Sequence, residues 1–176
     1  MSSSAPRGID HVGVTVPDLE AASRFFEDAF GAVALYDNMV RTDPPYQGKE
    51  AETTLGLEAG ASVIAMRMLR LGNGPGIELF EMRVPEQRPS ARASDLGLQH
   101  FAVYVDDIAA AARRFEAAGG VLLTQPKEML GIEKGEGNAF CYGRAPWGMT
   151  IELLCWPGKA KWETTAPAER YKAPAS

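Results

Sequence analysis

The chain contains only two histidines, and they occupy equivalent positions in a repeated stretch of sequence. Residues 97–120 repeat residues 8–31 without a gap, at a constant offset of 89 (100 − 11) that places His100 on His11. Identities aligned in this way indicate two copies of one supersecondary unit. Each copy therefore offers one imidazole, which binds metal ions through a neutral ring nitrogen.

Two glutamates are repeated further along each copy. The motif Ile-Glu-Leu occurs at residues 77–79 and again at residues 151–153, at an offset of 74 (151 − 77). Two carboxylates neutralise a divalent cation, and the mixture of nitrogen and oxygen donors suits Zn, Ni, Co, Mn or Fe(II) better than Ca. The sequence thus predicts one divalent metal ion, with positions left open for substrate oxygens, and with four ligands: His11, Glu78, His100 and Glu152.

Strand patterning explains how these side chains reach one surface. In residues 9–16 the alternation places the valines on a face that packs against a helix and His11 on the opposite face. In the motif at residues 77–79 the flanking Ile and Leu are core residues, which turns Glu78 to that same opposite face. If the two copies pair about a pseudo-twofold axis, we expect their four metal-competent side chains to converge.

The remaining elements follow the same order in both copies. Asp18 is expected to cap a helix that ends at Gly31, and the second copy repeats this helix from Asp107 to about residue 118. The first copy carries a longer polar loop at residues 37–52, where substrate selection is expected. The other strands are predicted at residues 33–36, 62–69, 77–83, 98–105, 121–124, 139–144 and 150–156.

These patterns divide the chain into five segments. Residues 1–7 are expected to form a disordered arm, residues 8–84 the first module and residues 85–96 a linker. Residues 97–157 form the second module, and residues 158–176 are expected to be a tail that is either disordered or lies against a partner subunit.

Composition excludes several classes of function. With 176 residues, a net charge of −5 and a pI near 5.1, the chain shows no basic surface for nucleic acid. No apolar run is long enough to cross a membrane, and the first residues lack the apolar core of a signal peptide. Cys141 and Cys155 are expected to be reduced, buried thiols. A cytoplasmic protein with a small-molecule substrate is predicted.

The sequence resembles the vicinal oxygen chelate superfamily, which includes glyoxalase I, methylmalonyl-CoA epimerase, extradiol dioxygenases and antibiotic-resistance proteins. The resemblance rests on residues 9–12, 77–80, 98–101 and 151–154. It implies an α+β fold of two tandem βαβββ modules that form a half-barrel with a shared metal site. It also implies that the four residues named above are the ligands of a glyoxalase-type site, and that the protein is a homodimer.

Three functions are compatible with this resemblance. We favour an isomerase, epimerase or lyase that acts on a small carbonyl substrate, such as an acyl-CoA or a keto acid, through a metal-stabilised enolate. The resemblance implies that Glu152 or Glu78 is then the base.

An Fe(II) ring-cleaving dioxygenase with His11, His100 and Glu152 as its ligands ranks lower, because Glu78 as a fourth ligand occupies a position that such an enzyme needs open. A metal-free protein that binds an antibiotic is the third reading. The retention of all four ligand types argues against it.

Overall fold

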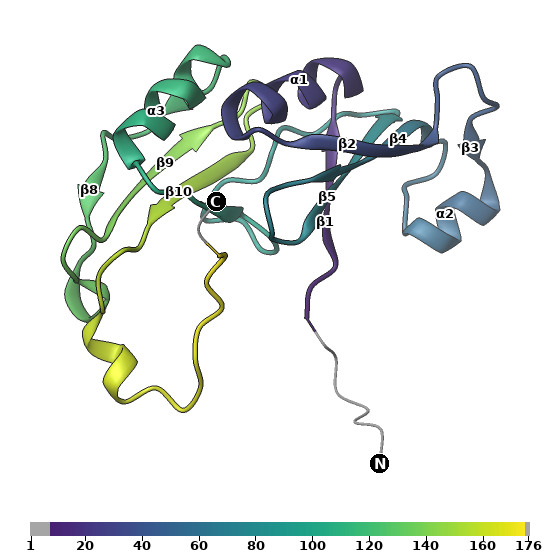
Figure 1. Cartoon of the computed structure of the whole chain (residues 1–176). Coiled ribbons are helices and arrows are strands. Elements are labelled where there is room, and N and C mark those ends of the chain that lie inside the picture. Colours follow the sequence, from purple (N-terminus) through teal and green to yellow (C-terminus); the bar gives the residue numbers. More distant parts are fainter. Residues whose placement is uncertain (1–7, 175–176) are drawn as a thin grey trace. The chain divides into compact units, whose positions relative to one another are not determined.

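The computed structural model describes residues 8–174, so the arm expected at residues 1–7 lies outside the described part of the chain. The chain divides into two compact units (Figure 1). Within the described residues, the first unit comprises residues 8–23 and 32–86, and the second comprises residues 24–31 and 87–174. Each unit contains one five-stranded sheet.

The first sheet has the strand order β1-β5-β4-β2, with β3 paired to β4. Its outer strand β1 runs parallel to β5, and the other pairs are antiparallel. The first repeat consists of β1 (His11–Val16), α1 (Leu19–Phe30), β2 (Val33–Met39), β3 (Tyr46–Gln47), α2 (Lys49–Leu55), β4 (Ser62–Arg70) and β5 (Gly76–Arg83).

The second sheet repeats this topology in the order β6-β10-β9-β7, with β8 paired to β9 and β6 parallel to β10. The prediction of an α+β fold with two βαβββ modules is confirmed. The second repeat consists of β6 (His100–Tyr104), α3 (Ile108–Ala117), β7 (Val121–Leu122), β8 (Lys127–Glu128), the 3-10 turn η1 (Gly131–Glu133), β9 (Ala139–Arg144) and β10 (Thr150–Cys155).

The start of α1 is fixed to β5 by a buried carboxylate. The first N–H groups of a helix have no partner within the helix. The Asp18 carboxylate accepts from the backbone N–H of Ala21 at 2.7 Å, as expected for an N-cap, and the Glu81 carboxylate accepts from the N–H of Leu19 at 2.8 Å. The guanidinium of Arg41 donates to Glu81, with a shortest distance of 2.6 Å. This network ties the helix to the strand that carries Glu78.

The core of the second unit depends on close approach of backbone to an aromatic ring. Phe115 of α3 is fully buried. A Cβ atom at Gly120 or Gly143 would lie 2.3 Å or 2.4 Å from this ring, so only glycine fits at either position. Phe115 also packs edge-on against Phe25 of α1, with ring centroids 5.5 Å apart.

The C-terminal segment, expected to be disordered or to lie against a partner subunit, packs in part on its own unit. It forms a 3-10 turn, η2 (Lys161–Thr164), and continues along the second unit as irregular chain. Ala160 is buried, Trp162 packs against Trp156, and the hydroxyl of Tyr104 donates to the backbone carbonyl of Tyr171 at 2.9 Å. Single anchoring residues hold the segment, which explains why its sequence has no periodicity.

Two further expectations can be compared with the described residues. Cys141 and Cys155 are free and buried, which confirms the prediction of unpaired thiols. Among residues 8–174, no helix combines the length and apolar character that crossing a bilayer requires.

Candidate metal centre

The first histidine and the first glutamate are brought together by the parallel pairing of β1 with β5. In this register His11 lies opposite Gly76, and Gly13 lies opposite Glu78. The His11 Nε2 atom is 3.2 Å from Glu78 Oε2. A Cβ atom at Gly76 would lie 2.9 Å from the sulfur of Met68 and 3.2 Å from the carbonyl oxygen of Leu69, so a larger residue here would displace the Met68 side chain opposite Glu78.

The second unit repeats this arrangement on β6 and β10. His100 lies opposite Thr150, and Glu152 stands two residues further along β10, opposite Ala102. The His100 Nε2 atom is 3.4 Å from Glu152 Oε2. The repeat therefore extends from the sequence to the strand register and to the pair of atoms that face each other.

The other ring nitrogen of each histidine is held by the preceding residue. His11 Nδ1 is 2.8 Å from Asp10 Oδ2, and His100 Nδ1 is 3.3 Å from Gln99 Oε1. A proton on Nδ1 leaves the lone pair on Nε2, the atom that faces the glutamate. The hydrogen bond that His11 Nδ1–H donates to the Asp10 carboxylate is the main cause of a raised pKa of His11, and the charge of Glu78 adds to it.

The second pair lies in a less exposed environment than the first. The exposed fractions are 39% and 20% for the His11 and Glu78 side chains, and 27% and 14% for those of His100 and Glu152. Burial raises the pKa of the Glu152 carboxyl, and the neighbouring His100 and Tyr142 partly oppose this effect. Glu152 is thus the more buried of the two carboxylates, and its burial favours the protonated form.

Tyr142 is a residue of this site that the sequence analysis did not identify. It lies directly opposite Glu152 in the pairing of β9 with β10, and its ring contacts His100 edge-on with centroids 5.2 Å apart. Met68 takes the corresponding place opposite Glu78 in the first unit. The alternation within β9 places Tyr142 on one face of that strand, but only the register shows that it adjoins Glu152.

Each pair fits a divalent ion by donor chemistry and by spacing. A metal ion binds imidazole nitrogen and carboxylate oxygen at about 2.1 Å, so two such ligands lie about 3.0 Å apart at right angles and about 3.4 Å apart at the tetrahedral angle. The observed separations of 3.2 Å and 3.4 Å agree with these values. The hydrogen bond at each Nδ1 supplies the orientation that metal-binding histidines usually receive.

The structure thus collects the four predicted ligands into two pairs, one in each unit. Within residues 8–174, neither unit gathers three or more histidine, cysteine, aspartate or glutamate side chains into a metal-binding group. Each pair alone contributes two donors. That both pairs bind the same ion remains a prediction of the sequence repeat.

Comparison with known proteins identifies the family. The sequence model of the Glyoxalase/Bleomycin resistance protein/Dioxygenase superfamily matches residues 10–142. The chain belongs to this superfamily. A relative from Actinomyces sp, named 2-epi-5-epi-valiolone epimerase, is 33% identical over 166 residues, which cover 93% of this chain and 87% of the relative.

Solved structures of the superfamily share the fold of this chain. A glyoxalase family protein from Bacillus cereus superposes with a TM-score of 0.66 at 23% identity, covering 88% of this chain and 97% of that one. Glyoxalase I from Zea mays gives a TM-score of 0.57 at 17% identity, covering 86% of this chain and 45% of that one. At these identities the likeness shows the fold alone, so the chemistry has to be argued from the residues of the site.

Proposed function

We propose that this superfamily member is a divalent-metal-dependent epimerase that inverts a carbon next to the carbonyl of a small hydroxylated cyclic ketone. The observation that carries the proposal is the histidine–glutamate pair, repeated in both units with the same register and the same facing atoms. The relative named as an epimerase supports this reaction class.

The four paired side chains would hold the metal ion: His11, Glu78, His100 and Glu152. Zn, Ni, Co, Mn or Fe(II) all accept such donors. When bound, a divalent ion polarises the substrate carbonyl and stabilises the negative charge that develops as the neighbouring carbon loses its proton.

Glu152 is our candidate for the base that removes this proton. Its partly buried carboxyl has a raised pKa, which brings it closer to the value at which a general base works best. Glu78 occupies the equivalent position in the other repeat and is more exposed. Epimerisation requires that a proton leave one face of the carbon and that a proton return to the other. Glu78 is our candidate for the donor, and each glutamate would have to leave the metal ion to exchange its proton, with Glu78 protonated from solvent beforehand.

The relative is named for a ketone, 2-epi-5-epi-valiolone. This name favours a cyclic ketone as the substrate over the acyl-CoA or keto acid that the sequence analysis also allowed. It also favours enolate chemistry over the two alternative functions. Oxygen uptake with a catechol would support the Fe(II) dioxygenase. Tight binding of an antibiotic by a protein that takes up no metal would support the resistance protein.

Nuclear magnetic resonance in deuterated water tests the proposed reaction. The protein is dialysed, reloaded with Zn, Mn, Ni, Co or Fe(II) and incubated with 2-epi-5-epi-valiolone. We expect deuterium to enter at the carbon next to the carbonyl while a second epimer appears. In Glu152→Gln we expect kcat to fall at least about a hundredfold, as for the loss of a general base. Wild-type protein that exchanges no hydrogen with any of these metals would refute the proposal.

A further inference from the structure

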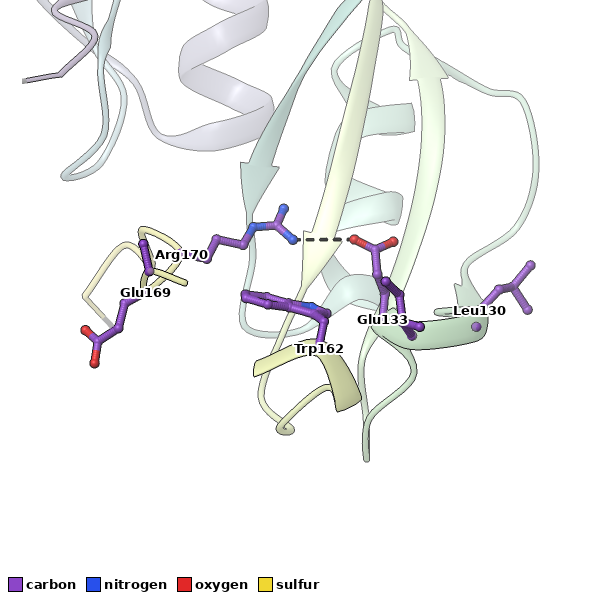
Figure 2. Close-up of a pocket in the computed structure, with 8 residues that line it drawn as sticks. Leu130, Glu133, Trp162, Glu169 and Arg170 are labelled. Atoms are coloured by element: carbon purple, nitrogen blue, oxygen red, sulfur yellow. Dashed lines mark ion pairs between the residues drawn. The ribbon is translucent and has the colours of Figure 1, made fainter. Parts of the chain in front are cut away.

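The C-terminal segment borders an open pocket on the second unit. The pocket has a volume of about 660 Å³, which lies within the range usual for small-molecule sites. Part of its wall is apolar and comes from Leu130 and Ile132, whose side chains are exposed, and from Trp162 of η2. Figure 2 shows Arg170 and Glu133 facing each other across this space, above Trp162.

The polar groups of this pocket retain hydrogen-bonding capacity. Arg170 Nη1 is 3.6 Å from Glu133 Oε1, which is a long ion pair, and both side chains remain partly exposed. The Arg170 guanidinium lies 4.7 Å from the centre of the Trp156 ring, and this cation–π contact fixes its plane. A guanidinium has several N–H donors and a carboxylate several acceptor sites, so this pair can bind additional hydroxyl groups.

The wall made by the C-terminal segment is held in place by contacts that do not use these groups. Glu163 accepts hydrogen bonds from the Trp156 indole at 3.2 Å and from the backbone N–H of Ala160 at 2.9 Å. The Tyr104 hydroxyl donates to the carbonyl of Tyr171, next to Arg170. The pocket is therefore a formed feature of the unit, with its charged pair left facing the open space.

The pocket lies on the same face of the second sheet as the second histidine–glutamate pair. Trp156, which lies beneath Arg170, follows directly after β10, the strand that carries Glu152. Trp162 and Phe140 pack against the cluster that contains Leu154 and Trp156. The Phe140 ring in turn contacts Tyr142, with centroids 5.8 Å apart, and Tyr142 contacts His100. Since Glu152 and Leu154 alternate onto the same face of β10, a continuous row of side chains connects the pocket to the second pair.

From this arrangement we infer that the C-terminal segment completes the substrate site, with Trp162 as a stacking platform and with Arg170 and Glu133 as specificity-determining residues for a neutral, hydroxylated ring. The inference rests on the proposed function and extends it. The faces of such a ring consist of C–H groups, which pack on an indole, and its edge carries hydroxyls that donate to Glu133 and accept from Arg170. A paired carboxylate and guanidinium also disfavour a strongly charged ligand, because either charge would repel one partner.

Four variants and one control test this inference with 2-epi-5-epi-valiolone. In Arg170→Ala, Glu133→Gln and Trp162→Leu we expect KM to rise by about tenfold or more, because a hydrogen bond to a charged group or a stacking face is lost. We expect kcat to fall by less than about threefold, since these residues bind the ring and do not move its proton. Arg170→Lys should recover only part of the loss, because an ammonium lacks the planar fork.

The control is Lys161→Ala, which removes an exposed charge from the same turn without touching the pocket lining. Its KM should match that of the wild type, and thermal unfolding of all variants should show that the fold is kept. A KM unchanged in Arg170→Ala and Trp162→Leu, with wild-type turnover intact, would overturn this inference and leave the proposed function standing.

If the wild type does not turn the ketone over, the proposed function fails, and the pocket is then judged by binding alone. Calorimetric titration with the same ketone would support the pocket if binding is present in the wild type and at least about tenfold weaker in Arg170→Ala. Absent binding, or equal binding in both proteins, would overturn the inference.

Discussion

The orientation of His11 by Asp10 predicts how strongly the protein binds metal when this contact is removed. Loss of a group that orients a metal-binding histidine typically weakens metal affinity by about ten- to a hundredfold. Asp10 sits 2.8 Å from His11 Nδ1, but its side chain is 93% exposed. Solvent screening therefore places Asp10→Ala at the low end, at about tenfold weaker binding.

The second repeat supplies an internal comparison. Gln99 is uncharged and lies further from its histidine, at 3.3 Å. Charge-assisted hydrogen bonds are about twice as strong as neutral ones, so Gln99→Ala should lose half the free energy, which corresponds to about a threefold weaker affinity. Asp10→Ala is expected to weaken metal binding more than Gln99→Ala, because Asp10 is charged and lies closer to its histidine than Gln99 does.

Competition between the dialysed protein and a chromophoric chelator for Zn measures these affinities. The matched control is Asp106→Ala, which removes an exposed aspartate shortly after β6, the strand that begins with His100. Its zinc affinity should equal that of the wild type. Wild-type affinity in Asp10→Ala, or an equal loss in the control, would show that Asp10 does not orient a metal ligand.

Two predictions concern stability. Arg67, whose side chain is 15% exposed, donates to the carboxylate of Asp37 with a shortest distance of 2.6 Å. Arg67→Met should therefore lower the free energy of unfolding in urea by about 2 kcal/mol. The control Arg70→Met, at an exposed position of the same strand, should change it by almost nothing. Arg67 lowers the pKa of Asp37 in the folded protein. The stabilisation by this pair is therefore complete above the pKa that Asp37 has in the unfolded chain, and it is lost as the pH falls through the pKa of Asp37 in the folded protein. A loss of stability in Arg67→Met that stays the same in acid would contradict the pairing. Gly143→Ala drives a methyl group into the buried Phe115 ring and should cost about 1–3 kcal/mol, visible as a lower Tm; an unchanged Tm would show that the ring can move.

The sequence was sufficient for the repeat, for the order of the long strands and helices, and for the strand face that carries each candidate ligand, but it missed the short strands β3 and β8 and placed a loop where β3 lies and α2 begins. Alternation about Val14 and Val16, both buried, turned His11 outward as predicted. The strand register could not be predicted from the sequence, because the parallel pairing of β1 with β5 joins segments far apart in the chain and depends on long-range packing. For the same reason Tyr142 was not identified as a neighbour of Glu152.

The C-terminal pocket was also beyond prediction from sequence. Its polar pair joins Glu133, in a turn of the second module's variable loop, to Arg170 in a segment without periodicity. No spacing rule connects such residues, since irregular chain is placed by individual contacts such as that between Trp162 and Trp156. The composition of the segment indicated disorder because an Ala- and Pro-rich stretch usually buries little apolar surface.

The count of metal ions per chain tests the central claim most directly. Wild-type protein, His11→Ala and His100→Ala are each reloaded with Zn, dialysed and measured by elemental analysis. The repeated histidine–glutamate pairs predict about one ion per chain in the wild type and almost none in either variant, because each variant removes one of the donors on which the ion depends. Two ions in the wild type, one ion retained in a variant, or no metal in any of the three proteins would contradict the account.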